Sequence, residues 1–514
     1  MFKKLLEFIL NAIKGMTAYK DVNSTLDTTN LYTISADMQD AIDVWTNMYK
    51  DKSPWLDDSK GIYSLGLPKL ICQSIQRQML SEMETDITDP HAIPVGEEEI
   101  EIIKNTRASF LNDIYKNHLI NKLPDNLEKA LATGGMIIKP YISNDSIYFD
   151  INFQGEFLPL QFNDDGDITD IAFTDQFVSN KNLFTRIERQ TFNQDTHTVV
   201  IQNKAFKTEI IDGNSDNAKQ DLGKEVPLTV IDKWANISPE VTIQNVDSPL
   251  YGYYKVPLGN NIDMNCPLGI SIFSPAVKLI RKADEQFSRL DWEYEGGQLA
   301  IDVDETAIPS QETYYGTVPM DKTTNRLYRK LDLGTETTYN AFAPTLRDAN
   351  YIQGLNTYTN KIEDIIGLSR GALSQVDTEA RTATEIKILK QRTYITITDN
   401  QQALEKCIRS VIKASDVLAT LYNLSVDGVY NLNIEWKDNV LTDTNTELQE
   451  RLLLCNNNIL STAEVRAWYT GETEEEAQEK LDIMQKRKME NMMNDVFTQQ
   501  NESTLEKNED PKEE

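Results

Sequence analysis

Cysteine and histidine are both scarce in this chain of 514 residues, which has four cysteines and three histidines. No C-x-x-C pair occurs and no cysteine has a neighbouring His, so neither a metal site nor a disulfide framework is supported. We expect reduced thiols in a cytosolically made protein. No histidine accompanies a second His or a G-x-S-x-G segment, which argues against a Ser-His or metal-hydrolase site. The residues are Cys72, Cys266, Cys407, Cys455, His91, His118 and His197.

Other signatures of an enzyme are missing as well. The chain has no G-x-x-x-x-G-K-[ST] loop and therefore no evident means of hydrolysing a nucleotide. Carboxylates are so abundant, at 81 Asp and Glu, that any acid-base pair chosen from the sequence would be arbitrary. We expect no catalytic residues, no metal and no cofactor.

Basic residues are in deficit. Lys and Arg total 51 against 81 acidic residues, which gives a formal net charge of −30. A protein that grips phosphates needs a basic surface, so a free-standing nucleic-acid binder is disfavoured. A protein that guides DNA without holding it is not excluded. The hydrophobic fraction of 40% is ample for globular folding, and the length predicts about three structural regions.

Long apolar runs are also lacking, and nowhere does the chain offer the ~20 uninterrupted apolar residues of a membrane span. The N-terminus superficially resembles a signal peptide, but Glu7 and Asn11 interrupt its apolar stretch and no small-residue cleavage site follows. At helical period this segment, within residues 1–36, instead predicts an amphipathic helix that docks on a protein surface, with membrane-surface binding as the alternative. The shared apolar face comprises Phe2, Leu5, Leu6, Ile9 and Ile13.

The first half of the chain changes from helical to strand periodicity. Apolar residues recur at helical spacing over 37–131, whereas 136–142 and 147–153 are short β-branched and aromatic runs. We expect strands and hairpins to about residue 236. The polar segment 163–167 is interpreted as a tight Asp-Gly hairpin turn, because a calcium loop would need a Glu that is missing. A second exposed hairpin tip is predicted at 212–216.

An amphipathic helix is predicted from Ser274-Pro275, an N-cap and first helical residue, to Gly296-Gly297. One arc is apolar and the opposite side is basic, with Glu285 among the cations. Such a helix fits a protein neighbour on one side and water or a polyanion on the other, although an ordinary solvated face also explains the cations. The apolar arc comprises Ala276, Leu279, Ile280, Ala283, Phe287 and Leu290; the basic side has Lys278, Lys282 and Arg289; Asp284 and Asp291 lie on a shoulder.

A small β-containing excursion and a returning helix follow. Strand-like pieces occur at 299–303, 317–318 and 326–333, punctuated by Pro and Gly. The second helix is predicted over 346–366 and ends at Gly367. The two helices and the excursion should form a hairpin-like projection from the main body.

A polar loop and a long helix complete the pattern. The loop, about 367–381, precedes a capping box at Thr382-Ala-Thr-Glu385 and a long apolar stripe that reaches Leu421. The run 393–398 is rich in β-branched residues, so we expect strain or a bend there. A strand is predicted at 430–436.

The C-terminal part is predicted to be helical from about residue 443. Further capping boxes lie at Ser461-Thr-Ala-Glu464 and Thr473-Glu-Glu-Glu476. From residue 499 the chain is polar and charged, which predicts a disordered tail.

The order of these parts resembles the portal proteins of long-tailed bacteriophages that infect Gram-positive bacteria. The resemblance covers most of the chain and is strongest from about 250 to 425. It rests on Gly269-Ile-Ser-Ile-Phe273, the helix that ends at Gly296-Gly297, the strand-rich excursion, Lys361-Ile-Glu-Asp-Ile-Ile-Gly-Leu-Ser-Arg-Gly371 and Thr382-Ala-Thr-Glu-Ile386.

The resemblance implies an α+β, mainly helical portal fold, assembled as a ring, usually of twelve subunits. The implied tunnel loop is near neutral, so a strong electrostatic grip on DNA is not expected from it; its candidate residues are Arg370, Gln375, Asp377, Glu379 and Arg381. The implied parts are an N-terminal segment (1–36), a wing (37–265), a first stem helix (266–297), a clip (298–344), a second stem helix (345–367), the tunnel loop (368–383), a long wing helix with the following strand (384–442), crown helices (443–498) and the acidic tail (499–514).

The same resemblance implies a function in the virion. The ring would be made in the host cytoplasm and stand at one capsid vertex, where it initiates capsid assembly, passes double-stranded DNA without sequence specificity and connects head to tail. Implied partners are the terminase large subunit, the head-tail adaptor, the major capsid protein and the scaffold, with no membrane. We hypothesise that Lys278, Lys282 and Arg289 form sparse basic rings in an otherwise acidic, non-adhesive channel. The alternatives are a minor capsid or tail protein, and an α+β hydrolase or transferase.

Overall fold

The computed structural model consists of two compact units, 1–436 and 437–514. Both helices and sheets are present, so the predicted α+β class is confirmed. The described residues are 34–81, 83–90, 106–210, 223–304, 312–313, 316–317, 328–331, 339–375, 383–436, 444–457, 459–470, 472–484 and 486–487. The predicted N-terminal helix, the tip at 212–216, the capping residue Thr382 and the tail from 499 lie outside them.

Four helices begin the first unit, in the region where helical spacing predicted them. Ser35 accepts a hydrogen bond from the Met38 backbone N–H and so caps α2, and Gly134 ends α5 with a left-handed φ of 101°. Each helix buries one apolar face, which explains the spacing seen in the sequence. The helices are α2 (Ala36–Tyr49), α3 (Leu67–Leu80), α4 (Arg107–Ile114) and α5 (Leu123–Thr133).

Two antiparallel sheets follow, as the strand-like runs predicted. The smaller has the strand order β10-β2-β3 and the larger β4-β5-β6-β7-β8, with β9 also paired to β7. The turn at 163–167 joins β4 to β5, and Asn163 Oδ1 accepts the Asp167 backbone N–H at 2.7 Å. The strands are β2 (Gly135–Ser143), β3 (Ser146–Phe153), β4 (Phe157–Phe162), β5 (Ile168–Ser179), β6 (Asn182–Asn193), β7 (Thr198–Glu209), β8 (Lys224–Val226), β9 (Glu240–Gln244) and β10 (Gly252–Lys255).

The larger sheet carries buried charges that the sequence analysis did not identify. Asp170 on β5 is fully buried, and its carboxylate accepts hydrogen bonds from Nε and Nη2 of Arg189 on β6. Glu188 lies between Lys139 and Arg186, with nitrogen-oxygen distances of 3.0 and 3.2 Å. Each buried charge has a partner of opposite sign, which offsets part of its desolvation cost. For Asp170 the burial still raises the pKa, against the lowering effect of Arg189.

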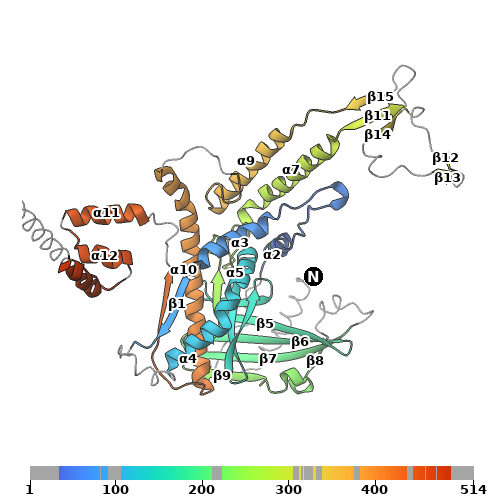
Figure 1. Ribbon diagram of the computed structural model, residues 1–514. Coiled ribbons are helices and arrows are strands. Elements are labelled where there is room, and N and C mark those ends of the chain that lie inside the picture. The colour runs from blue at the N-terminus through green and yellow to red at the C-terminus, as the bar shows by residue number, and fades with distance from the viewer. Residues whose placement is uncertain are drawn as a thin grey trace, which may run out of the picture. The chain divides into compact units, whose positions relative to one another are not determined.

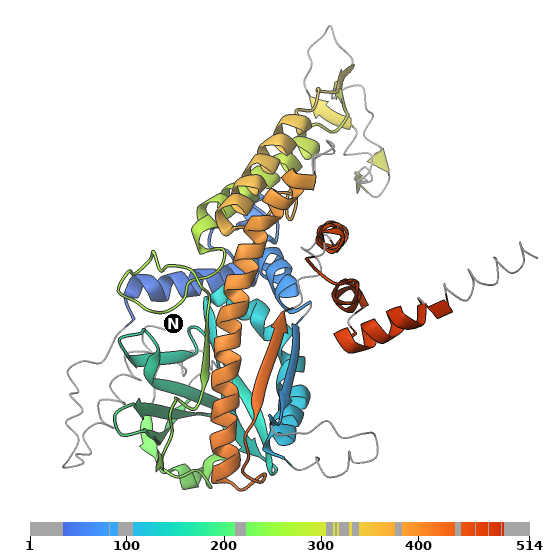
Figure 2. The ribbon, with the colours of Figure 1, turned by 90° about the vertical axis from the view of Figure 1, so that its left-hand side faces the viewer.

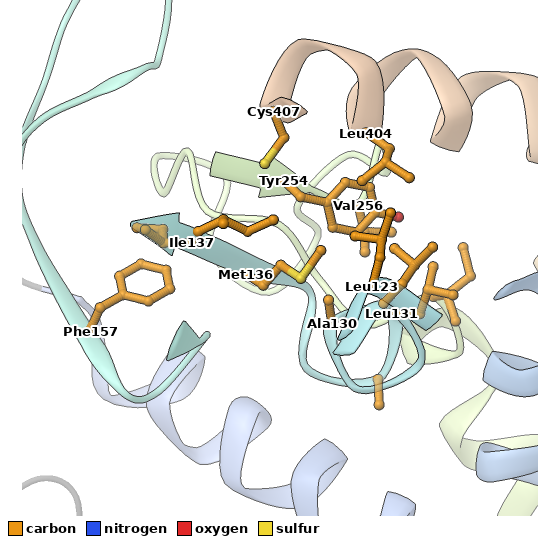
Figure 3. Packing of buried hydrophobic residues seen from close by; sticks show 14 of the residues in the cluster. Leu123, Ala130, Leu131, Met136, Ile137, Phe157, Tyr254, Val256, Leu404 and Cys407 are labelled. Atoms are coloured by element: carbon orange, nitrogen blue, oxygen red, sulfur yellow. The ribbon is translucent and has the colours of Figure 1, made fainter. Parts of the chain in front are cut away.

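The long helix α10 (Ala383–Leu421) lies against β10 and β2. Figure 3 shows Leu404 and Cys407 of α10 facing Tyr254 and Val256, next to Met136 of β2. The helix backbone approaches the strand so closely that a Cβ on Gly252 would lie 2.3 Å from the Cys407 carbonyl oxygen. Glycine at this position therefore allows the helix to reach the sheet.

Other elements border α10. Figure 2 shows β1 (Met83–Thr88) and β16 (Asn431–Trp436) running beside it as an antiparallel pair. The predicted strand at 430–436 is thus confirmed, while its partner β1 was not anticipated. One core joins the helices α2 to α5, the smaller sheet, the end of α9 and α10.

The run 393–398 is helical without interruption, although its β-branched residues favour a strand. Ile397 is buried, and the hydroxyls of Thr393 and Thr396 bond to residues 367–369. Tertiary contacts therefore override the local propensity, as they commonly do.

The C-terminal unit is a small helical assembly with α11 (Thr444–Asn456), α12 (Thr462–Thr470) and a further helical stretch at 474–484. Both predicted capping boxes are confirmed. Glu464 N–H donates to Ser461 Oγ at 3.0 Å while Ser461 N–H donates to the Glu464 carboxylate, and Thr473 and Glu476 repeat the pattern. None of the described helices combines the length and the apolar character that a membrane crossing requires.

Candidate functional site

Two helices of the first unit run side by side as a hairpin (Figure 1). They are α7 (Val277–Gly296), preceded by a 3-10 turn (Ser274–Ala276), and α9 (Asp348–Ile366). Gln286 of α7 donates to the Tyr351 carbonyl, and the Gly354 backbone lies beside the Gln286 side chain. Ser274 lies inside the first turn and not at its N-cap, but Gly367 ends α9 in the left-handed region as predicted.

An ion pair joins the outer ends of the two helices. Arg347 donates through Nε and Nη2 to both carboxylate oxygens of Glu293, at 3.1 and 2.7 Å, and its backbone N–H donates to the same carboxylate. The Arg347 hydrogen bonds lower the pKa of Glu293. This bidentate arrangement fixes the spacing of the helices where the chain enters the excursion.

The excursion contains a small sheet of order β14-β11-β15, in which β11 pairs parallel with β14 and antiparallel with β15. The predicted pieces at 299–303 and 326–333 correspond to β11 and β14, and that at 317–318 overlaps β13. The strands are β11 (Ala300–Asp304), β12 (Glu312–Thr313), β13 (Gly316–Thr317), β14 (Tyr328–Leu331) and β15 (Tyr339–Phe342).

Asp284, which the helical projection placed on a shoulder between the apolar and basic sides, lies on the packed side of α7. Its carboxylate accepts the Trp55 indole N–H and the Leu65 backbone N–H, both at 2.9 Å. Burial raises its pKa, and these two donors oppose that effect. Asp284 therefore attaches α7 to the segment that follows α2.

The basic side of α7 is exposed as predicted. Lys282 donates to Glu285 at 2.7 Å, and so does Arg281, at 2.9 Å, a cation on the same face that the sequence analysis omitted. The Lys282 hydrogen bond is the main reason why the pKa of Glu285 is lowered. Lys278 and Arg289 are exposed and have no carboxylate partner among the described residues, so they are the cations best able to meet an external anion.

A hollow of about 430 Å³ adjoins this basic side and is lined by Lys60, Tyr63, Arg289, Trp292 and Tyr351, among others. The Trp292 side chain is 65% exposed. Aromatic and cationic groups both line the hollow, but they lie on the surface and form no enclosed catalytic cleft.

The first residues of the loop after α9 are hydrogen-bonded to a buried carboxylate of that helix. Glu363 is fully buried, and its Oε1 accepts the backbone N–H groups of Gly371, Leu373 and Ser374 at 3.2, 2.6 and 2.9 Å. Its Oε2 accepts the Ser374 hydroxyl at 2.9 Å. Such a cluster of backbone donors stabilises negative charge without a neighbouring cation.

Arg370, a predicted tunnel-loop residue, is paired with Asp364. Asp364 also meets Arg392 of α10, at 3.0 Å, and the Arg370 hydrogen bond is the main cause of its lowered pKa. Gln375 donates its backbone N–H to Asn356 at 3.1 Å. The other candidates, Asp377, Glu379 and Arg381, lie outside the described residues.

The site offers no evident covalent chemistry. Within the described ranges, no three His, Cys, Asp or Glu side chains gather as a metal site would need. The arrangement instead provides a braced hairpin, an exposed basic helix face and a loop whose start is fixed. No sequence signal marked Glu363 or Asp364, because Glu363 binds loop backbone and Asp364 pairs with Arg370 and with Arg392, 28 positions away.

Comparison with known families assigns the chain. A family model described as "Phage portal protein, SPP1 Gp6-like" matches residues 87–492, which is more than three quarters of the chain and includes the hairpin, the loop and α10. No curated protein matches the chain.

Proposed function

Because the chain belongs to the SPP1 Gp6-like family of phage portal proteins, we propose that it forms the ring-shaped channel at one vertex of a phage capsid. DNA would be packaged through this channel and would later leave through it. The family is a structural component of phage particles, which favours this role over a hydrolase or transferase. The same assignment favours a portal over a minor capsid or tail protein.

One observation carries the proposal: helix α7, a small sheet, helix α9, a loop and the long helix α10 follow one another within the matched span. We assign α7 and α9 to the stem and the small sheet to the clip, where the terminase large subunit and later the head-tail adaptor would dock. Residues 368–383 would be the tunnel loop, 37–265 and 384–442 the wing, and 443–498 the crown. The wing would meet the major capsid protein and the scaffold.

The charge distribution supports passage of DNA without retention. Twelve subunits at −30 each would give a ring of −360 before counterions, and a ring of this charge repels phosphates. The two proposed stem helices contribute little to this excess, with five Lys or Arg and eight Asp or Glu, three of them buried. Residues 437–514, by contrast, have 19 acidic and nine basic residues.

We propose that the exposed cations Lys278, Lys282 and Arg289 form sparse basic rings facing the DNA. Counterion-release binding grows with each phosphate neutralised, so a few cations would align the duplex without trapping it. Lys278 and Arg289 would contribute most, since Glu285 shares the charge of Lys282.

The ring itself is tested by negative-stain imaging of the purified protein. Rings with a central channel are expected. A protein that remains monomeric at high concentration and in the presence of scaffold would contradict the proposed function.

The basic rings are tested separately by the double variant K278E/K282E. Capsids carrying it should contain less DNA than wild type at low salt, and the deficit should shrink as salt screens the charges. The matched control is K224E/K413E, because Lys224 and Lys413 are exposed cations in the proposed wing. Equal DNA content in the K278E/K282E and control capsids would reject the basic rings and leave the portal assignment intact.

A further inference from the structure

The first residues of the loop after α9 are held more firmly than a surface loop requires. Glu363 accepts four hydrogen bonds from residues 371–374, and it has no cation within salt-bridge distance among the described residues. Three of the four donors are backbone N–H groups, and all three meet the same oxygen, Oε1. One side chain of α9 thus provides the acceptors that a helix or sheet would otherwise supply.

Helix α10 holds the residues just before this segment, at 367–369, through two threonines. Thr393 Oγ1 accepts the Ser369 backbone N–H at 2.8 Å and lies 2.7 Å from the Ser369 hydroxyl. Thr396 donates its hydroxyl to the Gly367 carbonyl at 3.1 Å. A Cβ on Gly367 would lie 2.3 Å from Thr396 Oγ1, so the contact between α10 and this turn is close.

Charged groups complete the attachment at the surface. Asp364 of α9 pairs with Arg370 of the loop and with Arg392 of α10. These pairs are exposed on their basic side and are worth little individually. The Glu363 bonds, in which a buried carboxylate meets half-buried donors, therefore provide more of the stabilisation.

We infer that Glu363 is a positioning residue, which fixes residues 371–374 against the end of α9 and so sets where the loop enters the channel. The inference rests on the proposed function, because only in a ring does the loop meet DNA. Residues 367–375 would then move with the ends of α9 and α10 as one body. DNA would contact a loop whose base keeps a constant height in every subunit.

Hydrogen exchange of the full chain tests the bonds directly. In the wild type the amides of Gly371, Leu373 and Ser374 should be protected. Glu363→Met keeps the side-chain volume but removes both acceptors. Exchange of the Leu373 and Ser374 amides should then speed up at least ~10-fold, the minimum for losing a bond to a charged group. The Gly371 amide, which also donates to Ser374 Oγ at 3.0 Å, should change less. Glu363→Gln keeps one carbonyl oxygen, and its amide N–H₂ can donate to the Ser374 hydroxyl, so protection should be largely restored.

The control for exchange is Glu295→Gln, which neutralises an exposed carboxylate on α7 and should leave the three amides unchanged. Rapid exchange of these amides in the wild type would overturn the inference, whether or not Glu363→Met folds. Equal protection in the wild type and in Glu363→Met would overturn it as well.

DNA content tests the positioning role. Rings of Glu363→Met should still assemble, but capsids that carry them should package or retain less DNA, and Glu363→Gln should recover wild-type content. If Glu363 only stabilised the fold, Glu363→Met would lower the melting temperature. In rings that still assembled, however, DNA content would not fall with Glu363→Met and recover with Glu363→Gln. Normal DNA content with exposed amides would refute the positioning role. Failure of the wild type to form rings would refute the proposed function, while the exchange result would still decide whether the Glu363 bonds exist.

Discussion

Replacing Gly252 with alanine should push α10 away from the sheet that it covers. The added Cβ would lie 2.3 Å from the Cys407 carbonyl oxygen and 2.6 Å from the Val411 Cγ2 methyl. Ordinary contacts of a Cβ begin at 3.4 Å, so the helix backbone would have to move by about 1 Å. The φ of Gly252 is not in the left-handed region, so the strain comes from the contact and not from the backbone conformation.

The free-energy cost follows from this displacement. A gap of about 0.5 to 1 Å forfeits a quarter to a half of the dispersion energy of the contacts that it opens. The buried side chains of α10 that would separate from the sheet include Leu404, Cys407, Ile408 and Val411. Because backbone blocks the new methyl group, we expect a destabilisation of about 3 kcal/mol, near the upper end for overpacking.

Thermal unfolding of the purified variants measures the effect. G252A should melt several degrees below the wild type. The matched control is G259A, since a Cβ on Gly259 would meet nothing within 4 Å, and its stability should stay within about 0.5 kcal/mol of the wild type. If G252A and G259A melt at the same temperature, the close approach of α10 to β10 is wrong.

Two further predictions concern the buried charges of the larger sheet. R189M leaves the fully buried Asp170 without its partner and should lower the free energy of unfolding by about 3 to 5 kcal/mol, measured by thermal unfolding. D170L/R189M should recover most of that loss. A double variant as unstable as R189M would contradict the pairing. Although burial opposes ionisation of Glu188, Lys139 and Arg186 hold its pKa at about 2. This depressed pKa contributes stability that is present above about pH 4.5 and is lost as the pH falls toward 2. E188Q should therefore be less stable than wild type at neutral pH, and the difference should vanish in acid. A constant difference in stability from pH 7 to 2 would contradict the low pKa of Glu188.

Periodicity predicted most of the individual elements. Apolar spacing placed α2, α3, α7, α9 and α10. Short β-branched and aromatic runs with turn residues between them placed β2 to β5, and predicted further strands to about residue 236 without placing them individually. These signals depend on neighbours within one or two turns or strands. Gly367 ended α9 and both C-terminal capping boxes formed as predicted, since a cap involves residues only three or four positions apart. The order of the elements was also sufficient to indicate the family.

Local rules failed where distant segments meet. The run 393–398 favours strand but is helical, because Thr393, Thr396 and Ile397 find partners on the end of α9 and in the core. Asp284 was projected onto a shoulder of α7, and no local pattern showed that Trp55 and Leu65 donate hydrogen bonds to it. Strand β1, which pairs with β16 more than 340 residues away, lies in a region predicted to be helical and was missed.

The sequence by itself determined the acidic charge, the order of helices and strands and the exposed cations of α7. All of these depend on composition or on short-range spacing. Only the tertiary structure decided that Glu363 accepts hydrogen bonds from the backbone of the following loop and that Arg370 is paired with Asp364. It also decided that Gly252 leaves room for α10 to pack against the sheet. A buried carboxylate needs hydrogen-bond donors, and no periodic pattern reveals which part of the chain will supply them.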